Sequence, residues 1–203
     1  MIVTQPGAIV LSAVAGYLIG SIPVGYLIGR SQGVDVRSHG SGKMGATNVL
    51  RTLGPKASAA VMVCDIGKGV LAVGLVLLTG HGIEAEVAAG VAAILGHIFP
   101  VFVGFRGGRG VATSLGALLM ISPAVGVAAL LIGLAVIARS RLASLGFLVG
   151  GALALVLTLG LFLNRLETLF PVVYCLIAFL IVAAAHRDNI QRLAAGTERK
   201  IQL

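Results

Sequence analysis

Long apolar stretches separated by short polar segments dominate the chain. An α-helix needs about 20 consecutive apolar residues to cross the hydrocarbon core of a membrane. Five stretches approach or exceed that length, and they cover residues 8–28, 57–78, 87–103, 142–163 and 169–185. Another stretch, 111–138, is about one and a half spans long and is interrupted by Ser122-Pro123. It predicts either one kinked helix or two short ones.

The positions of Lys and Arg favour one of these alternatives, because cytoplasmic loops of membrane proteins are enriched in both residues. The segment after the first span is basic, whereas residues 80–86 include acids and no Lys or Arg. A single helix over 111–138 would put Arg139, Arg141 and the basic C-terminal segment outside, and two helices put them inside. The charge pattern therefore predicts seven spans rather than five or six, with the N-terminus outside and the C-terminus in the cytoplasm.

Composition agrees with an all-α integral membrane protein that forms a single polytopic domain over residues 1–203. The chain is 58% hydrophobic and 11% charged, against about 25% charged residues in soluble domains. In a soluble protein the net charge of +8 would suggest nucleic acid. Here basic cytoplasmic loops explain it, so no nucleic-acid partner is expected. Cys64 and Cys175 lie in apolar stretches and are interpreted as small core residues.

A glycine-rich segment follows the first span. Gly40-Ser41-Gly42-Lys43-Met44-Gly45 matches a dinucleotide-binding string, but it does not follow a strand. Its likeness to a Walker loop also fails, because Met44 stands where Ser or Thr is needed. Two interpretations remain open. Backbone N–H groups, Ser41, Thr47 and Arg51 could bind an oxyanion, or the segment could be a flexible basic loop.

A second segment, Arg106-Gly107-Gly108-Arg109-Gly110, stands at the start of a predicted helix. Two cations around a glycine pair would bring N–H donors and the positive helix end to one point, which favours an anion site. Lys68 lies near the middle of the second span, and Asp65 is three residues before it, so the two can pair. A charge inside the membrane indicates either function or a structural ion pair.

Three segments together resemble one known family, the bacterial acyl-phosphate:glycerol-3-phosphate acyltransferases, or PlsY family. The similarity runs along the whole chain through residues 20–23, 40–51, 65–69, 96–101, 105–113 and 186–196. Two features depart from the family pattern. Lys43 stands where the family usually has Asn, and Arg106 and Arg109 stand where lysines are common.

The resemblance implies a seven-helix enzyme of the bacterial plasma membrane with a cytoplasmic active site. It would transfer an acyl group from acyl phosphate to the 1-hydroxyl of glycerol 3-phosphate, without a cofactor or metal. The residues implied at the catalytic and glycerol 3-phosphate end are Ser41, Arg51, Arg109, His186 and Asn189, of which Ser41, His186 and Asn189 would be catalytic. Those implied at the acyl-phosphate end are Asn48, Lys68, His97, Gly107 and Gly108.

The remaining chemistry favours direct transfer, and we expect the protein to be a monomer surrounded by membrane lipid. Outside the spans the chain offers no Cys nucleophile, no G-x-S-x-G string and no cluster with metal-ligand spacing. The proton of the attacking hydroxyl could go to His186 or to a phosphate oxygen of a substrate. A transporter or channel for an organic phosphate is the main alternative, because embedded Lys68 and broken helices would suit one.

Overall fold

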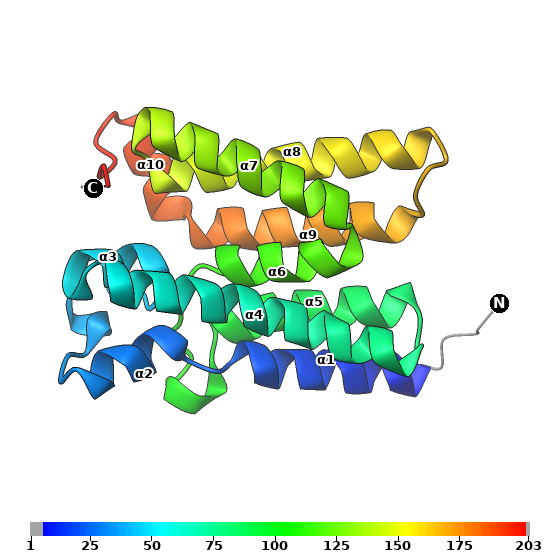
Figure 1. Cartoon of the computed structure of the whole chain (residues 1–203), viewed down its shortest axis with the longest axis horizontal. Helices are drawn as coiled ribbons and strands as arrows, with labels where there is room; N and C mark the ends of the chain where they lie inside the picture. Colours follow the sequence, from blue (N-terminus) through cyan, green and yellow to red (C-terminus); the bar gives the residue numbers. More distant parts are fainter. Residues whose placement is uncertain (1–5, 202–203) are drawn as a thin grey trace. The chain divides into compact units, whose positions relative to one another are not determined.

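The computed structural model describes residues 6–201, and its regular elements are helical (Figure 1). The helices are α1 (Pro6–Gly20), α2 (Val24–Ser31), α3 (Ala46–Leu53), α4 (Pro55–Thr79), α5 (Ile83–Ile98), α6 (Val111–Ile121), α7 (Pro123–Ser140), α8 (Ala143–Leu163), α9 (Leu169–Ala185) and α10 (Arg187–Ala194). Single 3-10 turns form at Val36–Ser38 and Val101–Val103. The prediction of an all-α membrane protein is confirmed.

The predicted split of residues 111–138 is also confirmed. Helix α6 ends at Ile121, and Pro123 opens α7. Proline is common at the first position of a helix, because the N–H groups of the first turn have no partner within the helix and the missing N–H of proline costs nothing there. By length and composition, five segments of the described chain can each cross a membrane, or six if the bent pair α9–α10 counts as one span. Helix α6, with 11 residues, is only about 16 Å long. The count of seven and the orientation stay predictions.

The sequence predicted one continuous helix for the first span, but the structure has two helices there. The span breaks after Gly20, and α2 starts at Val24. Pro23 lies between the two, with φ −90° and ψ 67°, and Val24 N–H donates to the Ile22 carbonyl at 3.0 Å. This is an inverse γ-turn, a conformation that redirects the chain within three residues.

The described chain divides between Ala117 and Leu118 into two compact units, which are described separately. In the first unit, α1 packs along α5 (Figure 1). Gly16 and Gly20 lie so close to Ala89 and Ala93 that a Cβ at either glycine would overlap the facing backbone. Close approach through small residues is how apolar helices associate in lipid. Gly16 and Gly20 therefore serve the packing of α1 on α5.

The amphipathic helix α3 packs on the start of α4 within the same unit. The Ser58 hydroxyl of α4 donates to the Ala46 carbonyl at 2.9 Å. Val36, Val49 and Val61 are fully buried around this contact. The segment between α2 and α4 therefore has an apolar core of its own, and it is not a loosely attached loop.

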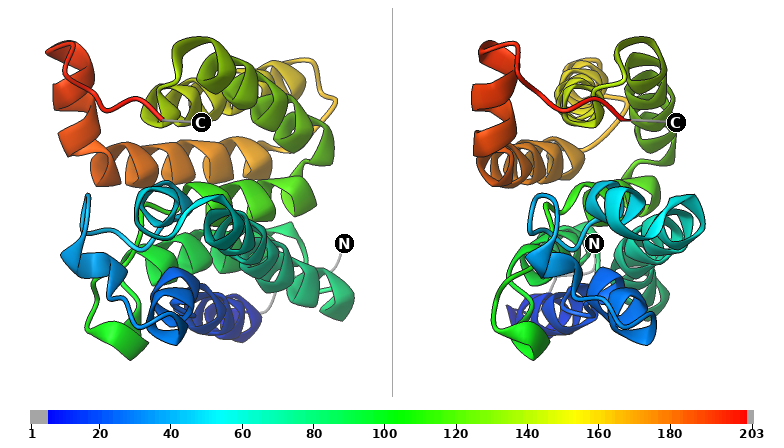
Figure 2. Two further views of the ribbon diagram at one scale, coloured as in Figure 1. Left: turned by 60° about the vertical axis from the view of Figure 1, so that its left-hand side comes forward. Right: turned by 90° about the vertical axis from the view of Figure 1, so that its left-hand side faces the viewer.

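In the second unit, α7 and α8 form a closely packed pair, and α8 also packs on α9. Helix α10 turns away from α9 by 70°, as Figure 2 shows. The bend places His186 between the two helices. Cys175 is buried in this unit, as predicted. Cys64 in the first unit is exposed on α4, so its interpretation as a core residue was wrong.

Candidate active site

The glycine-rich segment is organised by one side chain, Asn48, in the first turn of α3. Asn48 is 2% exposed. Its Oδ1 accepts a hydrogen bond from Ser41 N at 2.9 Å. Its Nδ2 donates to the carbonyls of Val36 at 2.9 Å, His39 at 3.1 Å and Lys43 at 2.9 Å. These contacts use all the polar atoms of the amide, so Asn48 holds the loop in shape.

Gly40 and Gly42 allow the loop to close around Asn48. Their φ angles are +58° and +68°, in the left-handed region that glycine enters without a steric penalty. A Cβ at Gly40 would also overlap Asn48 Oδ1. The segment is therefore an ordered turn, which removes the alternative of a flexible loop. It carries Ser41 at its tip, and Arg51 lies in the last turn of the helix that follows.

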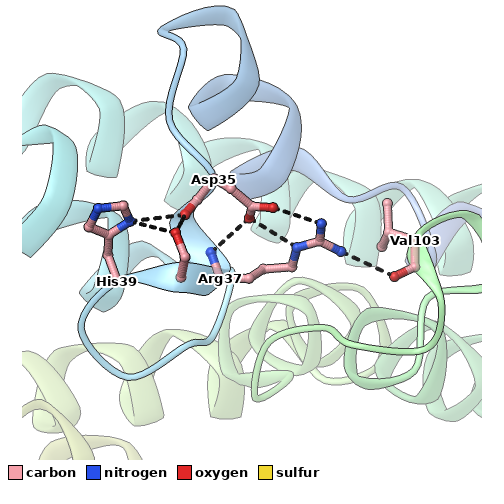
Figure 3. A network of polar contacts seen from close by, with 5 residues as sticks. Asp35, Arg37, His39 and Val103 are labelled. Carbon is pink, nitrogen blue, oxygen red and sulfur yellow. Dashed lines mark hydrogen bonds and ion pairs between the residues drawn. The ribbon is translucent and has the colours of Figure 1, made fainter.

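A second polar network joins the 3-10 turn before the glycine-rich segment to the chain between α5 and α6 (Figure 3). Arg37 binds Asp35 with Nη2–Oδ2 at 2.8 Å and Nε–Oδ1 at 3.0 Å. Its Nη1 donates to the Val103 carbonyl at 3.4 Å, and its guanidinium lies 4.3 Å from the Tyr26 ring centre. The hydrogen bonds from Arg37 lower the pKa of Asp35 to about 2. No motif in the sequence indicates this network, because Asp35 and Val103 belong to none.

The R-G-G-R segment is bonded to the last turn of α5. Gly107 N donates to the Ile98 carbonyl and Gly108 N to the His97 carbonyl, both at 3.1 Å. A Cβ at Gly107 would overlap the His97 carbonyl, and one at Gly108 would overlap the His97 ring. Because α5 carbonyls accept hydrogen bonds from these two N–H groups, the anion site predicted for this segment would have to use its other donors, and that site stays a prediction. The glycines allow a close approach that places half-buried Arg109 just before α6.

The predicted pair of Lys68 and Asp65 is confirmed, with Nζ–Oδ1 at 2.9 Å. His97 joins it, with Nδ1 at 3.6 Å from the same carboxylate oxygen. All three side chains are less than 8% exposed. The first unit thus brings together Lys68, His97, Gly107 and Gly108 at one place, and Ser41 and Asn48 at another.

His186 and Asn189 lie at the bend between α9 and α10 in the second unit, and both are buried. His186 Nδ1 is 2.8 Å from the Val182 carbonyl. A carbonyl only accepts hydrogen bonds, so Nδ1 carries a proton and the neutral ring has its lone pair on Nε2. The Phe147 ring meets the imidazole edge-on, with ring centres 6.4 Å apart.

Glu198 is a further residue at this bend, and the motifs did not reveal it. Its Oε1 accepts from Asn189 Nδ2 at 2.6 Å and from Ser144 Oγ at 3.0 Å, and its Oε2 accepts from Arg192 Nε at 2.8 Å. Burial alone would raise the pKa of Glu198, but these hydrogen bonds outweigh it and lower the pKa below 4.5. The carboxylate fixes the side chain of Asn189.

Known proteins match the chain over nearly all of its length. The family profile described as glycerol-3-phosphate acyltransferase matches residues 10–196. A glycerol-3-phosphate acyltransferase 3 of Dehalococcoides mccartyi is 45% identical, with 95% of each chain covered. A glycerol-3-phosphate acyltransferase of Thermus thermophilus is 43% identical, with 96% of each chain covered.

Solved structures agree with these sequence matches. The crystal structure of PlsY (YgiH), described as an integral membrane glycerol 3-phosphate acyltransferase in its glycerol 3-phosphate form, has a TM-score of 0.87 and 33% identity. The match covers 97% of this chain and 96% of the PlsY chain. A second structure of PlsY, in its lysophosphatidic acid form, has a TM-score of 0.85 and the same identity. The chain therefore belongs to the glycerol-3-phosphate acyltransferase family.

Proposed function

We propose that this protein transfers a fatty acyl group from acyl phosphate to the 1-hydroxyl of glycerol 3-phosphate, forming lysophosphatidic acid and phosphate. Its family makes it an acyltransferase. One observation supports the proposed acceptor and product: the two matching PlsY structures are described in a glycerol 3-phosphate form and a lysophosphatidic acid form. These two molecules differ by one acyl group, so they are the acceptor and the product of a single acylation.

Acyl phosphate suits the chemistry available. It is a mixed anhydride, already activated, and its leaving group is phosphate. The substrate oxygen would attack the acyl carbon, the bond from that carbon to the phosphate oxygen would break, and phosphate would carry away the bonding electrons. The enzyme then needs only to align two anions and to stabilise the charge that develops, which cations and fixed donors can do.

The proposed roles follow the chemistry of each group. Arg51 and Arg109 would hold the phosphate of glycerol 3-phosphate, and Ser41 would donate a hydrogen bond to it. His186 can accept a proton at Nε2, because Nδ1 is committed to Val182. Asn189, held by Glu198, would fix the orientation of the acceptor. The residues proposed to shape the acyl-phosphate end are Asn48, Lys68, His97, Gly107 and Gly108.

We further propose that the chain crosses the bacterial plasma membrane seven times as a monomer, with its active site in the cytoplasm. The split at Pro123 supports this topology, because it keeps Arg139 and Arg141 on the same side as the other basic segments. In this arrangement α6 and α7 are separate crossings.

The function is tested with purified protein, long-chain acyl phosphate and isotope-labelled glycerol 3-phosphate. We expect labelled lysophosphatidic acid in a chelator-containing buffer, and none when acyl-CoA or acyl carrier protein replaces acyl phosphate. Product from those donors alone would contradict the proposed donor. Uptake of labelled glycerol 3-phosphate into proteoliposomes without acylation would instead support the transporter alternative.

Direct transfer is tested separately, by incubating the enzyme with acyl phosphate alone and examining its peptides by mass spectrometry. We expect no acylated Ser41 peptide, and sequential kinetics when both substrates are varied. A rapidly formed acyl-Ser41 and ping-pong kinetics would contradict the direct mechanism, while leaving the overall reaction intact.

A further inference from the structure

The first unit contains a cluster of ionisable groups inside its apolar helices, formed by Asp65, Lys68 and His97 and called the buried cluster below. Asp65 and Lys68 lie near the middle of α4, a helix of 25 residues that is apolar enough to cross a membrane. Charges inside a membrane cost free energy and are retained where they have a role. The contacts of the cluster indicate which role this is.

Lys68 connects α4 to the break in the first span. Its Nζ lies 2.9 Å from Asp65 Oδ1 and donates to the Ile22 carbonyl at 3.1 Å. Ile22 stands in the turn between α1 and α2, where the continuous hydrogen bonding of the helix stops. Backbone groups at such a break must be satisfied by protein, since lipid offers no partner. The ammonium group thus combines an ion pair with Asp65 and a hydrogen bond to this carbonyl, and so joins α4 to the break.

His97 connects the cluster to the R-G-G-R segment. Its ring lies beside Asp65 and against the Cα of Gly108, and its carbonyl accepts the Gly108 N–H. Arg109 is the next residue in the chain. A shift of the His97 ring would therefore move the backbone that carries Arg109.

The cluster also adjoins the glycine-rich segment. A small cavity touches all three members of the cluster, and Met44 of the glycine-rich segment is part of its wall. The remaining lining residues are Ile22, Pro23, Val24, Gly25 and Pro100. Gly25 packs directly against the Met44 carbonyl, where a Cβ would overlap it. The break in the first span, the glycine-rich segment and the end of α5 thus meet around one ion pair.

We propose that Asp65, Lys68 and His97 are positioning residues that hold the glycine-rich and R-G-G-R segments in register, and that Lys68 acts through these segments without touching a substrate. The inference rests on the proposed function, because both segments are assigned there to substrate binding. It predicts that charge balance within the cluster matters more than the presence of an ammonium group. Removing one partner of a buried pair leaves an unpaired charge, whereas removing both does not.

The test compares Asp65→Asn, Lys68→Met and the double variant Asp65→Asn/Lys68→Met in the acyltransferase assay, with each substrate varied in turn. Lys56→Met is the matched control, since it makes the same change at an exposed site on the same helix. We expect each single variant to lower kcat/KM for both substrates by about 10- to 100-fold, because small misplacements of aligning groups cost that much. The double variant should recover at least about tenfold over Lys68→Met, and Lys56→Met should match the wild type.

A direct contact between Lys68 and acyl phosphate would give another pattern. Lys68→Met would then raise KM for acyl phosphate alone, and the double variant would be no more active than Lys68→Met. That result would overturn the inference. If the single variants do not fold, the double variant still decides, because a folded but inactive double variant also contradicts a positioning role. Failure of the proposed function would be seen earlier, as a wild-type enzyme that does not use acyl phosphate.

Discussion

Asn48 illustrates how one side chain can determine the shape of a loop, here the glycine-rich segment. Its amide is complementary to its surroundings, with one oxygen facing an N–H group and one nitrogen facing three carbonyls. A carboxylate of the same size has no donors to offer those carbonyls when it is ionised.

Asn48→Asp should therefore nearly abolish activity and destabilise the protein. Each buried carbonyl left without a donor costs about 1–3 kcal/mol, and a charge would face them as well. Thermal unfolding in detergent and acyltransferase activity measure the two effects. Asn164→Asp is the control, because Asn164 is exposed and its side chain donates to the Gly160 carbonyl within its own turn. Equal effects at both positions would contradict the assigned role of Asn48.

Gly108 and Gly67 form a matched pair of glycines in the first unit. A Cβ at Gly108 would overlap the His97 ring, whereas a Cβ at Gly67 meets no atom within 4 Å. We expect Gly108→Ala to lower kcat/KM at least about tenfold by displacing the R-G-G-R segment. Gly67→Ala should leave kcat unchanged and stabilise α4 by about 0.5–1 kcal/mol. Wild-type kinetics for Gly108→Ala would mean that the His97 contact does not position the loop.

At the scale of elements, the bend between α9 and α10 depends on a residue beyond both helices. Glu198 reaches back from the C-terminal segment to Ser144 at the start of α8 and to Asn189 and Arg192 on α10. One carboxylate therefore ties three segments of the second unit together. The lowered pKa of Glu198 reflects these bonds.

Glu198→Gln should lower stability at neutral pH, and the difference from wild type should shrink in acid. A carboxylate whose pKa is lowered by folding stabilises the folded protein fully at pH values above its pKa in the unfolded state, which is near 4.5. This stabilisation is lost as the pH falls through the pKa of the folded state. Thermal unfolding from pH 7 down to pH values well below 4.5 measures this. Asp188→Asn is the control, because the ion pair of Asp188 with Arg187 is exposed and such pairs contribute little. A pH-independent difference for Glu198→Gln would show that charge is not responsible.

At the scale of the whole molecule, the proposed topology depends on the short segment between α7 and α8. Helix α7 ends at Ser140, and Arg139 and Arg141 flank it. The positive-inside rule predicts that this segment is cytoplasmic, and in the proposed topology this prediction requires α6 and α7 to cross separately.

Labelling of single cysteines in intact cells tests this topology. In a background with Cys64→Ser and Cys175→Ser, we expect Asn164→Cys to react with a membrane-impermeant thiol reagent and Ser140→Cys to react only after permeabilisation. The charge at both sites is unchanged, so the substitutions do not bias insertion. External labelling of Ser140→Cys would contradict the seven-span topology.

The sequence by itself determined the fold class, the main helices, the split at Pro123, the ion pair of Lys68 with Asp65 and the family. Each depends on local information: the length of apolar runs, a proline, a spacing along one helix, or a motif string. Only the tertiary structure decided which polar groups are already occupied. The N–H groups of Gly107 and Gly108 go to the end of α5, Lys68 binds a carbonyl 46 residues away, and Glu198 binds a serine 54 residues away. The physical reason is that a hydrogen-bonding group is satisfied by whichever partner the packed helices bring near, and distance along the chain does not encode that partner.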